Sequence, residues 1–254
     1  AALDEIFLKD LVTGQTTLVS AAADGTPANR YVSGMTLLAG GTKVLFLSAA
    51  SNLVANDTNG QLNIFVKDIT TGAVTLVSSA ADGTPGNASS SDARVSLDGT
   101  KVLFESTATN LVANDTNGRL DLFVKDLATG TVTMVTSASD GTPANGDYYQ
   151  FTFSADGTKV VFTSGASNLV PGDTNGEPDI FVKDLATGAL TLVSAAADGT
   201  PANAESTFAA LSSDGTKVLF ATAASTLVPG DTNGGPDLFV KDLATGAVTM
   251  VTSA

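Results

Sequence analysis

Four short segments of the sequence carry oxygen-bearing side chains at a spacing that suits a metal ion. Each reads Asp-Thr-Asn-Gly and, after two further residues, ends on Asp or Asn. Calcium takes six to eight oxygen ligands, including backbone carbonyls and water. The candidate ligands are Asp57, Asn59 and Asn63; Asp115, Asn117 and Asp121; Asp173, Asn175 and Asp179; and Asp231, Asn233 and Asp237. The pattern therefore offers Ca²⁺ as a candidate cofactor.

A plain turn is the alternative for the same four segments. Asn-Gly favours a positive φ angle, and an Asp side chain can accept hydrogen bonds from the backbone just after it. The segments also differ from an EF-hand, which needs twelve residues and a terminal Glu. The sequence leaves both readings open: calcium loops, or turns with no cofactor.

The four segments belong to a repeat of 58 residues. Asp-Thr-Asn-Gly begins at 57, 115, 173 and 231, and Asp-Gly-Thr-Pro begins at 24, 82, 140 and 198. Such a fixed period indicates a repeat architecture. We place repeats at 5–62, 63–120, 121–178 and 179–236 and a partial repeat at 237–254, all within a single domain, 1–254.

Each repeat contains four short strand patterns. In the third repeat they cover 121–126, 131–136, 149–154 and 159–164, separated by Gly-containing turns. We name these strands c, d, a and b, so that one blade reads a-b-c-d. Four antiparallel strands repeated in tandem predict an all-β fold, a β-propeller of four-stranded antiparallel blades. A β-solenoid is less suitable, because its coils are usually about 20–30 residues long.

The repeat resembles a known family. Ser154-Ala-Asp-Gly-Thr-Lys-Val-Val-Phe, followed by Asp179-Ile-Phe-Val-Lys-Asp-Leu-Ala-Thr-Gly, is similar to the bacterial TolB-like (WD40-like) β-propeller repeat. The resemblance covers essentially the whole chain and implies the propeller fold. The chain departs from the family at Ala155, Leu97 and Ser213, where the family usually has Pro.

The sequence contains four full blades and one c-d half blade. We expect a five-bladed ring whose missing a-b pair would follow Ala254; the alternatives are a four-bladed ring with an extra hairpin and a larger ring built from several chains. Unpaired strand edges attract other chains, so we expect self-association. The first residue is Ala, and we expect the chain to be a piece of a larger exported bacterial protein, located outside the cell or at the cell surface, with the periplasm as alternative.

A second group of candidate residues lies where the copies differ from one another. These positions fall just before or within strand a, and they include all three tyrosines of the chain. Tyr and Arg are frequent anchors of binding interfaces, so we predict a ligand site at the axial mouth for a protein, peptide or glycan. Its residues are Arg30, Tyr31, Asp92, Arg94, Asp147, Tyr148, Tyr149, Gln150 and Glu205. The alternative is a surface that varies because little depends on it.

Composition narrows the function classes. The chain has no His and no Cys, which excludes His-based triads, thiol catalysis and Cys- or His-ligated zinc. A net charge of −14 disfavours nucleic acid, and no apolar run is long enough for membrane insertion. We therefore expect no catalytic residues and no enzyme, but a non-catalytic binding or scaffold module. The alternatives are a calcium-stabilised structural module without a specific ligand and a glycan-active enzyme that uses Asp92, Asp147 or Glu205.

A Lys-Asp dipeptide, such as Lys125-Asp126, recurs in every strand c. A pair that recurs in this way is a poor candidate for a unique active site. We interpret it as a structural feature that joins consecutive blades.

Overall fold

The computed structural model describes residues 4–252, and every regular element in that range is a β-strand. The last two residues of the predicted partial repeat, 253 and 254, lie outside the described residues. The chain divides into two compact units, Ala1–Thr133 and Met134–Ala254, each of which is described by itself. Within residues 4–252 no helix has the length and apolar character needed to span a membrane.

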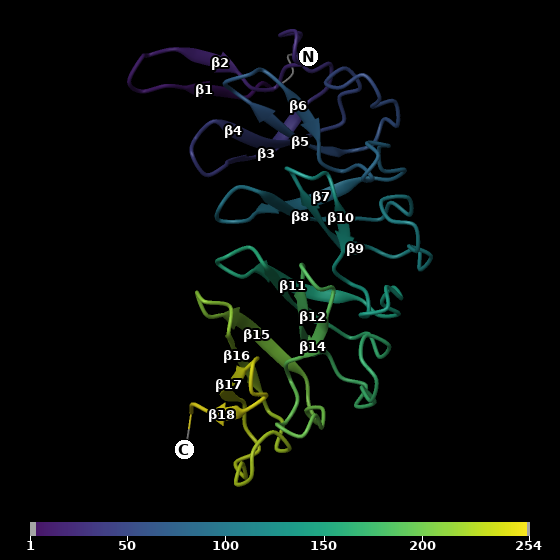
Figure 1. Cartoon of the computed structure of the whole chain (residues 1–254), viewed down its shortest axis with the longest axis vertical. Helices are drawn as coiled ribbons and strands as arrows, with labels where there is room; N and C mark the ends of the chain where they lie inside the picture. Colours follow the sequence, from purple (N-terminus) through teal and green to yellow (C-terminus); the bar gives the residue numbers. More distant parts are fainter. Residues whose placement is uncertain (1–3, 253–254) are drawn as a thin grey trace. The chain divides into compact units, whose positions relative to one another are not determined.

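The first unit contains one hairpin and two four-stranded sheets (Figure 1). In each sheet every strand pairs with the next one in the chain. The hairpin is β1 (Phe7–Lys9) and β2 (Thr16–Leu18); the first sheet is β3 (Val32–Leu37), β4 (Lys43–Ser48), β5 (Asn63–Asp68) and β6 (Val74–Leu76); the second is β7 (Ser90–Val95), β8 (Lys101–Ser106), β9 (Asp121–Asp126) and β10 (Val132–Met134).

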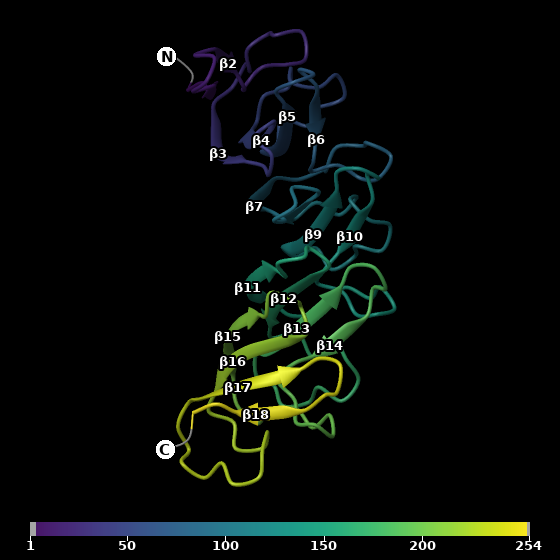
Figure 2. The same ribbon diagram turned by 60° about the vertical axis from the view of Figure 1, so that its left-hand side comes forward.

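The second unit contains two more sheets of the same kind (Figure 2). All neighbouring strands are antiparallel. The third sheet is β11 (Tyr148–Phe153), β12 (Lys159–Ser164), β13 (Asp179–Asp184) and β14 (Leu190–Leu192); the fourth is β15 (Ser206–Leu211), β16 (Lys217–Thr222), β17 (Asp237–Asp242) and β18 (Val248–Met250).

Each sheet is therefore an up-and-down meander in the order a-b-c-d, which is the blade of a β-propeller. The predicted all-β propeller fold is confirmed. The number of blades in a complete ring stays a prediction, and so does the single domain over 1–254. Strands b and c of the third repeat have the predicted bounds, whereas strand d is shorter, at 132–134, and strand a begins one residue earlier, at Tyr148.

Paired phenylalanines form the centre of each blade. Phe46 on β4 stands directly opposite Phe65 on β5, and their rings stack with centroids 5.6 Å apart. Both side chains are fully buried. The pair recurs in the other sheets as Phe104–Phe123, Phe162–Phe181 and Phe220–Phe239. Burial of such rings supplies much of the hydrophobic stabilisation of a blade.

The lysine of each Lys-Asp dipeptide in the four-stranded sheets fastens its blade to the preceding connection. Lys67 is 5% exposed, and its Nζ donates to the carbonyl oxygens of Ala21 and Ala22, at 3.0 and 2.9 Å. Its neighbour Asp68 instead accepts hydrogen bonds from the backbone of Thr70 and Thr71. Neighbouring residues of a strand point to opposite faces, so the dipeptide serves two separate structural purposes.

Candidate functional site

Strand a positions the residues that vary between repeats, and strand b holds the start of strand a. The side chain of Ser48 donates to the carbonyl of Tyr31 at 3.0 Å. In the second unit Ser164 donates to the carbonyl of Asp147, and Thr222 donates to that of Glu205, both at 2.9 Å. Each of these donors is almost completely buried. The backbone is thus fixed in the same way in repeats whose side chains differ.

A β-bulge interrupts strand a in every four-stranded sheet. The register between strands a and b shifts between Ser33 and Thr36 and between Ser91 and Arg94 in the first unit. In the second unit it shifts between Tyr148 and Phe151, one residue earlier in the repeat, and between Thr207 and Ala210. At the bulge of β7, Asp92 has a φ angle of 39°, where the first repeat has Gly34 with a φ angle of 55°. Bulges re-aim side chains and are frequent beside functional sites.

In the first unit two predicted residues line a hollow. Arg30 and Tyr31 surround it together with Asn29, Ala49 and Ser51, and its volume is about 430 Å³. Tyr31 is 51% exposed. Asp92 and Arg94 lie on β7, where their side chains form an exposed ion pair at 3.2 Å. The four predicted residues of this unit thus form two separate pairs: Arg30 with Tyr31 at the hollow, and Asp92 with Arg94 on β7.

In the second unit the two adjacent tyrosines have different surroundings. Tyr149 is 61% exposed, whereas Tyr148 is half-buried and its ring meets the edge of Phe151 with centroids 5.9 Å apart. Asp147, Gln150 and Glu205 are exposed. Tyr148 therefore helps to pack the blade, and Tyr149 is the better placed of the two for a ligand. The convergence of all nine residues on one axial mouth involves both units and stays a prediction.

The Asp-Thr-Asn-Gly loops connect strand b to strand c, and those of Asp57 and Asp173 lie beside the connection that leads into the next strand a. Asn59 Nδ2 donates to the carbonyl of Gly86 at 2.7 Å, and Asn175 Nδ2 donates to that of Ala202 at 2.8 Å. The first Asp of each loop is buried: Asp57, Asp115, Asp173 and Asp231. These loops lie at the end of the blade where strand a begins.

Burial changes the acidity of these aspartates. Burial, together with the negative charge of Asp121, raises the pKa of Asp115 to about 6. Burial likewise raises the pKa of Asp179 to about 6, against the lowering effect of hydrogen bonds from Ser194 and Asn175. Residues 4–252 contain no group of three or more His, Cys, Asp or Glu side chains arranged to hold a metal. A cation in these loops would therefore need amide and backbone oxygens besides the carboxylates.

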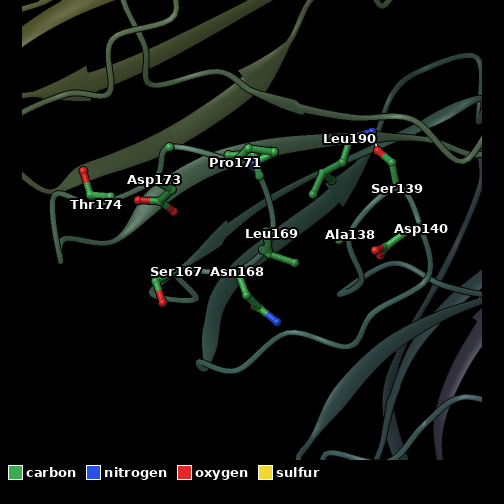
Figure 3. Close-up of a pocket in the computed structure, with 12 residues that line it drawn as sticks. Ala138, Ser139, Asp140, Ser167, Asn168, Leu169, Pro171, Asp173, Thr174 and Leu190 are labelled. Atoms are coloured by element: carbon green, nitrogen blue, oxygen red, sulfur yellow. Dashed lines mark hydrogen bonds between the residues drawn. The ribbon is translucent and has the colours of Figure 1, made fainter.

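The structure also contains a hollow that the sequence analysis missed. Its volume is about 560 Å³, and Figure 3 shows Leu169, Pro171 and Asp173 of the b-c loop along one side and Leu190 of β14 with Asp140 on the other. Asp140, Leu169 and Asp173 recur in the other repeats, so the variable positions gave no signal for it. The apolar Leu-Val-Pro segment inside a polar loop is the feature that could have indicated it.

No protein-family model and no curated protein matches the chain. Solved structures match in fold. The β-propeller domain of the Trilobed protease from Pyrococcus furiosus has a TM-score of 0.49 at 14% identity, over 90% of this chain and 59% of that one. An oligogalacturonate lyase in complex with manganese has a TM-score of 0.41 at 16% identity, over 100% and 73%. A protein assigned as TolB from Agrobacterium tumefaciens has a TM-score of 0.42 at 14% identity, over 98% and 88%.

These comparisons correct one expectation. We expected no enzyme, because the chain lacks His and Cys, but its structural neighbours include propeller domains of peptidases and a lyase. Enzymes thus share this fold. The lack of His and Cys was no sufficient reason to expect a chain without catalysis, and that expectation was wrong. The chain spans 59% of the Trilobed protease domain and 29% of a prolyl endopeptidase. The resemblance to TolB-like repeats is supported at the level of the fold.

Proposed function

We propose that this β-propeller module binds a polypeptide partner through strand a of its blades. One observation carries the proposal: side chains vary between repeats along a strand whose backbone is held identically in each blade. Tyr31, Ser89, Asp147 and Glu205 occupy the same position of the repeat, and the carbonyl of each accepts the same hydrogen bond from strand b. A fixed backbone with varied side chains is the arrangement of a recognition surface on a rigid scaffold.

The exposed side chains suit a polypeptide ligand. Tyr31 and Tyr149 expose more than half of their surface, and Tyr offers a large contact area with few rotatable bonds. Arg30 and Arg94 add planar donors, and Asp147 and Glu205 add acceptors. Tyr and Arg dominate the binding energy of many protein interfaces. A TolB-like ancestry and a location outside the cell or at its surface form part of this proposal.

The proposal is tested with a phage-displayed library of random peptides selected against the full chain. Peptides that bind are measured again on Tyr31→Ala and Tyr149→Ala. We expect at least one variant to lose 10-fold or more in affinity, as is usual for a buried interface anchor. Leu97→Ala is the matched control, because Leu97 is 76% exposed and follows β7 at the opposite end of strand a.

Two results would count against it. Peptides that bind both tyrosine variants as well as the original chain would exclude strand a as the recognition surface. Binding that depends on Tyr31 or Tyr149 on a glycan array, with no binder in the peptide library, would assign a glycan ligand instead. Calcium binding, the basis of the alternative structural module, would take place in the b-c loops and is compatible with either ligand.

A further inference from the structure

The first Asp-Thr-Asn-Gly loop contains a nitrogen atom surrounded by oxygen atoms. Asn63 Nδ2 lies 3.1 Å from both carboxylate oxygens of Asp57, 3.0 Å from Asn59 Oδ1 and 3.5 Å from the carbonyl oxygen of Gln61. An amide NH₂ group has two hydrogen atoms to donate. Four oxygens therefore converge on a centre that carries two donor hydrogens and a partial positive charge.

The other three loops replace this amide with a second carboxylate. Asp121, Asp179 and Asp237 stand where the first loop has Asn63, and all three are buried. An ionised carboxylate has acceptors and no donor. We call the oxygens that surround this position the oxygen cage. The substitution therefore removes the positive centre of the cage and places a second negative charge beside that of the first Asp of the loop.

The loop of Asp115 shows the consequence. Asp115 is 6% exposed, and its Oδ1 atom has no hydrogen-bond partner within the described part of the chain. A buried acceptor without a partner is costly, and it indicates a group that completes the site.

The loop of Asp173 shows that the second carboxylate is held in place. Asp179 Oδ1 accepts from Ser194 Oγ at 2.5 Å, and its Oδ2 accepts from Asn175 Nδ2 at 2.7 Å. The carboxyl group of Asp173 lies close enough to act on that of Asp179 through its charge. Two buried carboxyl groups are thus fixed side by side before any ligand is added.

We propose that the loops of Asp115, Asp173 and Asp231 each bind one calcium ion, at the position that Asn63 Nδ2 occupies in the first loop. The ligands are the two carboxylates and the backbone carbonyl two residues after the Asn, whose side-chain nitrogen donates to the second carboxylate in the loops of Asp173 and Asp231. Water completes the six to eight ligands that calcium takes at 2.3–2.6 Å. The first loop binds no ion, because the amide of Asn63 fills its cage.

The chemistry of the cage favours calcium over other common ions. All of its ligands are oxygens, whereas zinc sites in proteins are built mainly from Cys and His. Magnesium needs near-ideal octahedral geometry at 2.0–2.1 Å and keeps most of its water. The inference does not depend on the proposed ligand of strand a.

Calorimetric titration of the full chain with calcium chloride, after chelation and desalting, tests the proposal. We expect three ions per chain. Asp179→Asn should bind two, the triple variant Asp121→Asn, Asp179→Asn, Asp237→Asn should bind none, and Asn63→Asp should bind four. Because the first loop carries Asn at this position, the Asp→Asn variants should fold. In the original chain, calcium should also raise the melting temperature, since an ion bound only to the folded state stabilises it.

Two results would overturn the inference. One is an unchanged number of ions in the triple variant, which would place the ions elsewhere. The other is no heat and no rise in melting temperature on adding calcium to the original chain. If each carboxyl pair shares a proton instead, the triple variant melts at a higher temperature than the original chain. Calcium then changes the melting temperature of neither protein.

Discussion

The ammonium nitrogen of Lys241 lies 2.7 Å from the carbonyl oxygen of Ala195, which stands 46 residues earlier in the chain. The same nitrogen also reaches the carbonyl of Ala196, at 3.1 Å. Lys183 makes the equivalent bonds to Ser137 and Ala138. Strand c of each of these blades is thus tied to the connection that leads into strand a of the same blade.

Removing this buried ammonium group should destabilise the fold. Lys241→Met retains most of the apolar stem but removes the donor to the carbonyl of Ala195 and leaves that of Ala196 with the amide of Gly199 alone. We expect the free energy of unfolding to fall by about 2–4 kcal/mol, since bonds to charged groups contribute about 1.5–3 kcal/mol each and orphaned acceptors add a penalty. Urea unfolding measures it. Lys217→Met in the same sheet is the control: Lys217 is exposed and pairs with Asp242 at 2.6 Å, so its loss should matter far less.

The buried lysines should also make stability depend on pH. Burial lowers the pKa of Lys183 from 10.5 to about 8 in the folded chain. Between pH 8 and pH 10.5 the unfolded chain therefore binds more protons at this residue, and stability should rise with pH in that window. Urea unfolding at several pH values measures the slope. In Lys183→Met the slope should be smaller by the contribution of one proton, and an identical slope would contradict this account.

The hydrogen bond from strand b to the start of strand a should contribute to stability. Ser164 is fully buried; its Oγ donates to the carbonyl of Asp147 and accepts from the amide of Ala166. Ser164→Ala leaves that amide without an acceptor, at a cost of about 1–3 kcal/mol. Thermal or urea unfolding measures the change. Ser167→Ala changes an exposed serine of the same loop and should alter stability much less.

The bulge of β7 should tolerate Gly at position 92 but not a branched side chain. Asp92 has a φ angle of 39°, and the first repeat has Gly34 at the equivalent position. A β-branched residue in the left-handed region costs about 1–3 kcal/mol. We expect Asp92→Val to lower the free energy of unfolding by that amount, while Asp92→Gly changes it by less than about 1 kcal/mol. Equal effects of the two substitutions would show that the bulge imposes no such restriction.

Much of the fold could be predicted because the strand signals are local. Alternating apolar residues and Gly turns gave the bounds of β9 and β12, and the repeat gave the blade order. We expected the Lys-Asp dipeptide to join consecutive blades; in the structure its lysine ties strand c to the connection that leads into strand a of the same blade, and its aspartate accepts from its own turn. Its partners were not foreseeable, because Lys67 bonds to carbonyls of Ala21 and Ala22, and backbone acceptors leave no trace in side-chain identity.

The candidate site was predicted less completely. Internal variation located strand a, but the bulges were missed, because the residue types around Tyr149 and Gln150 carry no bulge signal. Sequence also could not separate Tyr148 from Tyr149, since packing on Phe151 decides which ring is exposed. The difference between Asn63 and its three Asp counterparts was visible in the sequence. Its meaning became apparent only with the four oxygens around Asn63 Nδ2.

The lysine bonds have a consequence for the gene. Successive buried lysines are 58 residues apart, and each finds its acceptors 45 and 46 residues upstream. If residues 63–120 were lost in one piece, Lys125 would take the place of Lys67 and meet Ala21 and Ala22. Unequal crossing-over between copies can therefore lengthen or shorten the coding sequence by whole multiples of the period while every such lysine retains its acceptors. A deletion of another length that removed the acceptor carbonyls but kept the lysine would leave a buried charge without its acceptors.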